Sequence, residues 1–323
     1  MIESWGGAGA ASVPPKVPES RPIPLGAPGI PPDAAQHRPA ARAPPSDSLA
    51  RPGAGAVVEE HASADGSARL VVRLRDGAAV ETVMLTSGSL CVSTQVGCAV
   101  GCLFCMTGRD GLVRNLSVDE IVAQVAFARE RRPVRRVLFM GMGEPSHNLA
   151  ATLEAMVALR RDFGIGRKNL VFSTVGSPAT FDRLLAHEVR PALALSLHAT
   201  DATLRARLLP RAPAIEPRAL FDAAMAYSDG ARQPLQVQWT LLEGVNDGDE
   251  ETDRLAAWMR GRRAIVNFIP WNDVPGTGFA RPGLERCRAL VRRFHRMGVL
   301  AKLRWSVASD VNGACGQLRG AVG

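Results

Sequence analysis

The sequence predicts an α/β fold, a partial parallel (β/α)6 barrel that carries a small β-hairpin extension on its N-terminal side. From residue 90 onward, short runs rich in valine, leucine and isoleucine alternate with helical patterns, which is typical of parallel strands covered on both faces. Polar and glycine-containing motifs follow the ends of these runs, where parallel barrels gather their chemistry. Just before them, two apolar segments flank Asp76-Gly77 and predict the hairpin.

The first 56 residues differ from the rest in composition. They hold twelve of the 23 prolines, and alanine, glycine and serine fill most of the remainder. No helical or strand periodicity runs through them. We therefore predict a disordered tail over residues 1–56 and one folded domain over residues 57–323.

The folded part predicts a regular series of elements after a hairpin at residues 68–74 and 79–85. Ser117, followed by Glu120 in the capping-box position, predicts a well-defined start for the first helix. The candidate strands are Leu90–Gln95, Arg136–Met140, Asn169–Thr174, Ala192–Leu197, Leu235–Leu242 and Ala264–Ile269. The helical patterns between and after them are Val118–Arg131, Ala150–Asp162, Pro178–His187, Pro217–Ser228, Asp249–Arg260 and Gly283–Met297.

A doubly wound parallel sheet is the alternative architecture. Such sheets often carry the nucleotide-binding fingerprint G-x-G-x-x-G after a strand. Here Gly141-Met-Gly143 continues as Glu-Pro-Ser146, without a third glycine. The absence of that fingerprint favours the barrel.

Composition and charge limit the class of protein. A chain of 323 residues with 46% hydrophobic content can bury a sizeable core. The formal net charge is +8, and only three of the 39 basic residues are lysines. This balance permits a polyanionic partner and suits RNA, because guanidinium groups bind phosphate bidentately and stack on bases. No signal peptide or membrane-length apolar run is visible, so we expect a cytoplasmic protein with reduced thiols and no membrane contact.

Three cysteines in a C-x3-C-x2-C spacing, Cys98, Cys102 and Cys105, lie just past the first predicted strand. One short loop can aim three thiolates at one point, and thiolates are the usual ligands of iron–sulfur clusters. A [4Fe–4S] cluster needs four ligands, so three leave one iron open. The alternatives are a zinc knuckle or a structural disulfide, but no fourth Cys or His follows Cys105 within forty residues.

This spacing, with Phe104 before the third cysteine, resembles the signature of the radical S-adenosylmethionine (SAM) superfamily. The resemblance implies that the open iron binds the amino and carboxylate groups of SAM. Hydrogen-bonding residues at the predicted strand ends suit the rest of that cofactor, and Glu144 could accept from its ammonium group. The candidate SAM contacts are Gly143, Glu144, Ser173, Ser196, His198 and Asn272.

Further motifs extend the resemblance over about four-fifths of the chain, from roughly residue 70 to its end. Together they resemble the RlmN/Cfr family of radical-SAM RNA adenine methyltransferases. The resemblance implies methylation of an adenosine, with C2 as the expected carbon, in 23S ribosomal RNA, transfer RNA or both. It also implies an electron donor such as flavodoxin or ferredoxin, and we expect a monomer. In order, the motifs are Cys91-Val-Ser-Thr-Gln-Val-Gly-Cys98, Arg114-Asn-Leu, Met140-Gly-Met-Gly-Glu-Pro145, Ser196-Leu-His198, Gly244-Val-Asn-Asp247, Ile269-Pro-Trp-Asn272 and Ala314-Cys-Gly-Gln-Leu318.

The same resemblance implies a division of labour between two cysteines outside the cluster loop. One SAM methylates Cys315, and a second SAM, reduced at the cluster, yields a radical that takes hydrogen from the S-methyl group. The resulting carbon radical adds to the adenine ring and links protein to RNA. Cys91 then forms a disulfide with Cys315 and releases the methylated base, while Glu81 matches the position of the proposed base.

The chain also departs from the family pattern. The C2 branch usually begins with a small helical accessory domain, whereas this chain begins with a low-complexity segment. Ala308 stands where the family usually has glycine, and Trp305 is bulky. The alternatives are therefore a divergent paralogue that methylates C8 or another RNA, and a radical-SAM enzyme with a non-RNA substrate. A non-enzymatic RNA-binding module with structural zinc is a third reading, and in each RNA reading we expect contacts from clusters such as Arg131, Arg132, Arg135 and Arg136, or Arg260, Arg262 and Arg263.

Overall fold

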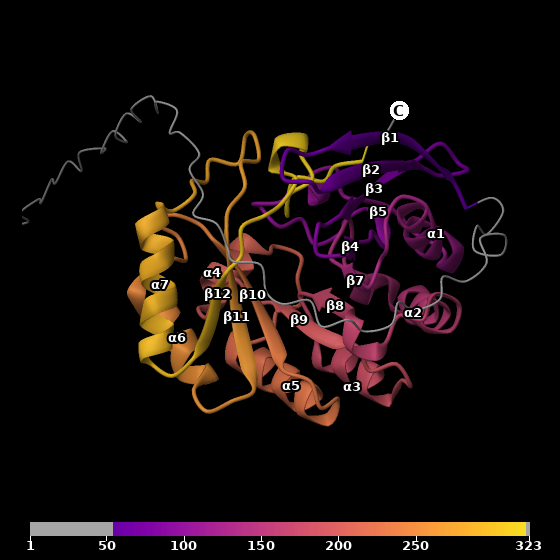
Figure 1. The fold of residues 1–323 in the computed structure, drawn as a ribbon. Helices are drawn as coiled ribbons and strands as arrows, with labels where there is room; N and C mark the ends of the chain where they lie inside the picture. The colour runs from indigo at the N-terminus through magenta and orange to yellow at the C-terminus, as the bar shows by residue number, and fades with distance from the viewer. Residues whose placement is uncertain (1–53, 321–323) are drawn as a thin grey trace, which may run out of the picture. The chain divides into compact units, whose positions relative to one another are not determined.

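The computed structural model describes residues 54–320, so almost all of the tail predicted over residues 1–56 lies outside the described residues. A ten-stranded sheet dominates this part, and strands β4 to β12 within it run parallel in an order that follows the chain (Figure 1). The strands are β1 (Ala56–Ala62), β2 (Ala68–Arg73), β3 (Ala79–Met84), β4 (Ser89–Cys91), β7 (Arg136–Phe139), β8 (Leu170–Thr174), β9 (Ala192–Ser196), β10 (Leu235–Leu241), β11 (Ala264–Pro270) and β12 (Leu300–Leu303).

Helices connect successive parallel strands, which confirms the predicted series of six β-α units. Helix α1 begins at the expected capping box, because the Ser117 hydroxyl accepts from the Glu120 N–H and the Glu120 carboxylate accepts from the Ser117 N–H. The helices are α1 (Val118–Arg129), α2 (Leu149–Phe163), α3 (Pro178–Ala186), α4 (Ala202–Leu208), α5 (Pro217–Gly230), α6 (Asp249–Met259) and α7 (Leu284–Arg296).

The structure adds three strands and one α-helix that the sequence pattern did not predict: β1, β6 (Leu112–Asn115), β12 and α4. It also divides the single strand expected at Leu90–Gln95. That segment forms β4 and then β5 (Gln95–Gly97), which pairs with β6 (Leu112–Asn115) in a separate two-stranded sheet. The division occurs because Thr94 and Gln95 both donate their N–H groups to the Met142 carbonyl, which draws the chain toward the loop after β7.

The two faces of the parallel strands bury different residues. Alternate side chains such as Val137, Phe172 and Trp239 pack with the helices in the main core. We call the opposite side of these strands the inner face. Part of it is a small apolar cluster, against which Cys91 and Met140 pack, formed by Leu138, Val171, Ala192 and Ala194. Because side chains alternate along a strand, the inner face continues on β9, β10 and β11 with a polar row in register: Ser196, Gln238 and Asn267.

The C-terminal segment, residues 304–320, is fastened to the antiparallel strands β1 to β3. The Asp310 carboxylate accepts from the Ser63 hydroxyl (2.5 Å) and from the Ala64 N–H (2.9 Å). Ala308 donates its N–H to Asp65 and takes a left-handed backbone conformation with φ 57°. A left-handed alanine costs about 1 kcal/mol relative to a conformation with negative φ, which explains why glycine suits this position.

Candidate active site

The three cysteines of the C-x3-C-x2-C motif lie on the loop between β5 and β6. Their side chains pack against an apolar group that includes Val100, Phe104, Leu208 and Trp271. Burial raises the pKa of the Cys98 thiol to about 11, and burial together with the neighbouring Cys105 and Cys98 raises the pKa of Cys102 well above its usual range. The three thiols therefore share one poorly solvated space and interact with one another.

A segment far along the chain supports this loop. The Leu103 N–H donates to the Leu208 carbonyl (3.0 Å), at the end of α4, and the Arg211 N–H donates to the Val100 carbonyl (3.3 Å). Gly101 has φ 65°, and a Cβ atom there would lie 2.2 Å from a guanidinium nitrogen of Arg211. Glycine suits this position because L side chains rarely adopt such a positive φ, whereas the flexible Arg211 side chain can move away from a Cβ atom.

The donor set suits an iron–sulfur cluster. Every cysteine in the described range is free, and three of them face a largely apolar shell that would exclude water. Within residues 54–320, no three His, Cys, Asp or Glu side chains are arranged so that they could hold a single metal ion. The assignment of the cluster to Cys98, Cys102 and Cys105 therefore rests on their spacing, their shared burial and their free thiols.

Glu144 lies beside this loop, in the turn after β7, and its carboxylate is held by three donors. These are the Thr174 hydroxyl (2.5 Å), the Val175 N–H (3.0 Å) and the Ser146 N–H (3.0 Å). Gly143, with φ 100°, brings the turn so close to Gln95 that a Cβ would lie 2.6 Å from the Gln95 side chain. A carboxylate has about four lone-pair directions, so the buried Glu144 keeps capacity for one further donor, such as an ammonium group.

Ser173 is the second-last residue of β8 and Ser196 is the last residue of β9, and both lie on the inner face. Both are half-buried, and within the described part of the chain neither hydroxyl has a hydrogen-bond partner. His198 follows two residues after Ser196 with its ring 4.9 Å from that of Phe104, edge to face. Three of the predicted SAM contacts, Ser173, Ser196 and His198, thus lie at or just after the carboxyl ends of neighbouring strands. One of them, His198, packs against Phe104 of the cysteine loop.

His198 should remain neutral at every physiological pH. Burial, with a smaller contribution from Arg205, lowers the pKa of His198 to about 3, while its Nδ1 accepts from the Thr240 N–H (3.0 Å). An unfolded chain protonates this histidine below about pH 6.5, so the stability that depends on the neutral ring is lost as pH falls from about 6.5 toward 3. From pH 6.5 to pH 4.5 we expect the free energy of unfolding to drop by about 2–3 kcal/mol more in the wild type than in His198→Asn.

Urea unfolding of both proteins at several pH values measures this difference. Asparagine can accept the same Thr240 N–H through Oδ1, so the comparison isolates the titrating ring. Parallel pH profiles for the two proteins would show that His198 is not the group responsible.

Asn272 stands apart from the other predicted SAM contacts. It is buried after β11, and its amide nitrogen donates to the Ser306 hydroxyl (2.7 Å) and to the Cys315 carbonyl (2.9 Å). The neighbouring Met106 N–H, on the cysteine loop, donates to the Gly316 carbonyl (2.7 Å). Asn272 therefore holds the backbone of Cys315 against the cysteine loop, and its contact with SAM remains a prediction.

Cys91 and Cys315 are brought to the same region from opposite ends of the chain. Cys91 ends β4 on the inner face, and burial followed by the proximity of Cys315 raises its pKa to about 12, opposed by Arg304. Cys315 itself is exposed and lies near Cys105. Both sulfurs are free in this structure, and they are close enough to interact.

Glu81, the third predicted catalytic residue, is buried on β3. Its carboxylate pairs with Arg69 and accepts from the Arg319 N–H (2.9 Å). It therefore anchors the segment that carries Cys315. Any action as a base would have to coexist with the ion pair to Arg69.

Sequence reasoning missed two buried side chains. Arg205, on α4, donates to the Val175 carbonyl (2.9 Å) and lies within electrostatic range of Cys102 and Glu144. Gln238, on β10, is buried with both amide atoms unpaired among the described residues. Neither belongs to a motif, and only the alternation along β10 could have indicated that Gln238 faces the barrel interior.

Three of the seven arginines expected to contact RNA have their side chains engaged within the protein. Arg131 pairs with Glu60, Arg132 donates to the Gly66 carbonyl, and Arg262 pairs with Asp222. Arg136, by contrast, has no ion pair within residues 54–320. These contacts make Arg131, Arg132 and Arg262 weaker candidates for RNA contacts than the sequence indicated.

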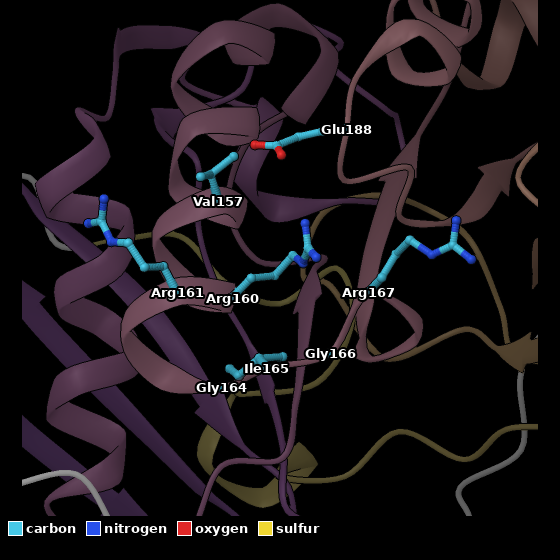
Figure 2. Close-up of a pocket in the computed structure, with 8 residues that line it drawn as sticks. All are labelled: Val157, Arg160, Arg161, Gly164, Ile165, Gly166, Arg167 and Glu188. Atoms are coloured by element: carbon cyan, nitrogen blue, oxygen red, sulfur yellow. The ribbon is translucent and has the colours of Figure 1, made fainter.

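A hollow of about 390 Å³ lies elsewhere in the fold (Figure 2). Arg160 and Arg161 at the end of α2, Arg167 just before β8, and Glu188 before β9 contribute to its lining. It thus lies at the amino ends of the strands, whereas Glu144, Ser173 and Ser196 lie at or near their carboxyl ends. We do not assign the reaction to this hollow, because parallel barrels place their chemistry at the carboxyl ends.

The fold is a partial parallel barrel that carries three free thiols near Glu144, a buried glutamate held by three hydrogen-bond donors. These features are those of a radical-SAM enzyme. The profile of the radical SAM superfamily matches residues 92–256. The chain is 57% identical over 266 residues to a probable RNA methyltransferase of Aromatoleum aromaticum, covering 82% of this chain and 75% of that one. It is 58% identical over 263 residues to another of Thiobacillus denitrificans, covering 81% and 73%.

Among solved structures, the fold is similar to that of a radical SAM methyltransferase from Sphaerobacter thermophilus. The TM-score is 0.79 at 36% identity, over 83% of this chain and 82% of that one. The chain belongs to the radical SAM superfamily and, within it, to the family of these methyltransferases. Its cofactors are accordingly a [4Fe–4S] cluster and SAM. No helix in residues 54–320 is long and apolar enough to cross a membrane.

Proposed function

We propose that this protein methylates an adenosine in RNA through an S-methylcysteine at Cys315, with C2 as the carbon and 23S ribosomal RNA or transfer RNA as the substrate. The observation that carries the proposal is the position of Cys315. Its segment is hydrogen-bonded to the cysteine loop and to Asn272, and its sulfur lies near Cys91. Relatives named probable RNA methyltransferases support RNA as the substrate.

The chemistry of the substrate explains why such a site is needed. C2 and C8 of adenine are electron-poor carbons that do not attack an ordinary methyl donor. When bound, SAM and the cluster supply both the methyl group and the radical that activates it. The protein must then hold one acceptor thiol near them, and the exposed Cys315 beside Cys105 meets this need.

The remaining residues take the roles predicted from the sequence. We assign the cluster to Cys98, Cys102 and Cys105, and SAM binding to the turn at Gly143 and Glu144 with Ser173, Ser196, His198 and Asn272. Cys91 is the resolving thiol, because it lies near Cys315 and both are free. Glu81 is the base candidate, and its bond to the Arg319 N–H places it under the same segment.

Comparing the modified nucleosides of a deletion strain and its parent by mass spectrometry tests the function. We expect one methyladenosine to be missing from the deletion strain and to return when the gene is restored. The chromatographic position of the nucleoside identifies C2 or C8, and fragment mapping separates ribosomal from transfer RNA. An unchanged set of methyladenosines would overturn the proposal and favour a substrate other than RNA.

A further inference from the structure

We propose that Arg109, Arg211 and Arg281 form an RNA-binding surface at the carboxyl-end mouth of the barrel, where their guanidinium groups take phosphates of the strand that flanks the target adenosine. This inference rests on the proposed function and deepens it. It assigns the RNA contacts to arginines that belong to none of the clusters expected from the sequence.

Arg211 and Arg109 border the cysteine loop. Arg211 follows α4, donates its backbone N–H to the Val100 carbonyl (3.3 Å), and has a guanidinium nitrogen 3.5 Å from the Gly108 carbonyl oxygen. Arg109 directly follows that glycine, and its guanidinium group donates to the Pro275 carbonyl in the loop after β11. Each arginine thus joins the cysteine loop to a segment that follows the carboxyl end of another strand.

Arg281 lies further along the loop after β11. Its Nε donates to the Trp271 carbonyl (2.5 Å), and its Nη2 lies 3.5 Å from Asn272 Oδ1. The amide nitrogen of the same asparagine donates to the Cys315 carbonyl (2.9 Å). Arg281 is therefore two contacts away from the cysteine that is proposed to carry the methyl group.

The exposed Cys315 lies between the two segments that carry these side chains. On one side, the Met106 N–H of the cysteine loop donates to the Gly316 carbonyl (2.7 Å). On the other, the Gln317 side-chain amide donates to the Asp273 carbonyl in the loop after β11 (3.0 Å). An RNA strand whose adenine reaches Cys315 must therefore pass over one or both of these segments.

The three guanidinium groups contact backbone carbonyls and an amide oxygen rather than carboxylates. All three residues are exposed, and none of them forms an ion pair within residues 54–320. Among the nearby carboxylates, Asp110 pairs with Arg319 (3.2 Å), while Asp273 and Glu243 are exposed and pair with none of the three. A guanidinium group has five N–H donors, so each side chain keeps its charge and several donors for a ligand.

This arrangement suits the phosphates of a polynucleotide. Guanidinium groups match phosphate oxygens in bidentate geometry, and side chains that are already ordered lose less freedom on binding. Three such groups on separate segments fit a chain with a charge at every nucleotide better than they fit one small anion. An acidic electron-donor protein also needs a basic surface near the cluster, but the position of the arginines beside Cys315, where the adenine must react, favours RNA.

Equilibrium binding of RNA to the reconstituted holoenzyme under anaerobic conditions tests the surface. The probe is a fluorescein-labelled single-stranded RNA that contains adenosine, titrated at several salt concentrations. The variants are Arg109→Gln, Arg211→Gln and Arg281→Gln, each with its lysine counterpart to restore the charge. Arg218→Gln is the control, because Arg218 is an exposed arginine of α5 that pairs with Asp222.

Iron content and thermal unfolding establish that each variant is folded and loaded. Arg211 borders the cysteine loop most closely, and its glutamine variant is the one at risk of losing iron. In that case the variants at Arg109 and Arg281 decide the outcome, because the contacts they lose are made to the loop after β11.

We expect each glutamine variant to bind the RNA about tenfold more weakly and the slope of log K against log salt to fall in magnitude by about 0.7, the value for one phosphate on a single strand. The lysine variants should keep the slope and recover most of the affinity. Arg218→Gln should bind like the wild type. SAM binding, measured by equilibrium dialysis, and the rate at which reduced flavodoxin reduces the cluster should be unchanged.

Three results would overturn the inference. Glutamine variants that bind RNA like Arg218→Gln would show that no phosphate contacts these side chains. A loss of affinity with an unchanged salt slope would show that the arginines only support the loops. Slower reduction by flavodoxin with RNA binding intact would assign the surface to the electron donor.

Failure of the proposed function is distinguishable from failure of this inference. Wild-type protein that binds no RNA, together with unchanged methyladenosines in the deletion strain, would remove both. A methyladenosine that is missing from the deletion strain, together with arginine variants that bind RNA normally, would remove the RNA-binding surface alone.

Discussion

Protein carrying Cys91→Ala should be purified from cells with RNA covalently attached. If Cys91 resolves the adduct, its loss leaves the cluster, SAM binding and methylation of Cys315 intact, and the reaction proceeds until the carbon–carbon bond to adenine has formed. Nothing then releases the base. The site can tolerate the change, because Cys91 is a small half-buried side chain and its truncation removes one sulfur, at a cost on the order of 1 kcal/mol.

The adduct can be recognised by its chemistry. A band of raised mass in denaturing gels should collapse to the mass of the protein plus a nucleotide after nuclease treatment, and reductant should not remove it. Peptide mass spectrometry should place the nucleotide on Cys315. Cys287→Ala is the matched control, since Cys287 is a buried cysteine of α7 far in sequence from both reacting thiols. Active Cys91→Ala protein, or inactive protein with a full cluster and no RNA, would reject the resolving role.

Cys315→Ala should abolish RNA methylation without disturbing the metal site. Asn272 and Met106 contact the backbone of residues 315 and 316, not the sulfur, so alanine keeps the segment docked. The exposed thiol contributes little packing. We therefore expect wild-type iron and sulfide content and normal SAM binding, but no methylated RNA and no S-methylcysteine.

Anaerobic assays with labelled SAM and RNA measure whether RNA methylation is lost while SAM binding is kept. The double variant with Cys91→Ala provides a further check. Cys315→Ala should prevent the covalent RNA that Cys91→Ala accumulates. A stabilising disulfide between the two cysteines would predict a different pattern, in which both single variants lose stability and neither carries RNA. Methylated RNA from Cys315→Ala would place the methyl carrier elsewhere.

Much of the fold could be predicted because its signals are local. The capping box at Ser117 and Glu120 sets the start of α1 within four residues of chain, and the predicted helices match six of the observed ones closely. Valine-rich runs identified the central parallel strands because those strands are buried on both faces. By contrast, β1 is mostly exposed and shows no clean alternation, and α4 is only seven residues long. Such elements form through their neighbours, so sequence periodicity does not indicate them.

The candidate site likewise consists of residues that the sequence identified and of contacts that only the structure shows. The amino-acid sequence by itself identified the cysteine loop, since three cysteines within eight residues can be recognised without any distant partner, and its motifs indicated Cys91, Cys315 and Glu144. Only the tertiary structure decided that Asn272 is hydrogen-bonded to the backbone of Cys315, and that Arg205 lies within electrostatic range of Glu144. Those relations join loops, helices and strand ends that lie far apart in the sequence. They arise from the packing of the helices and strands together, which no short stretch of sequence encodes.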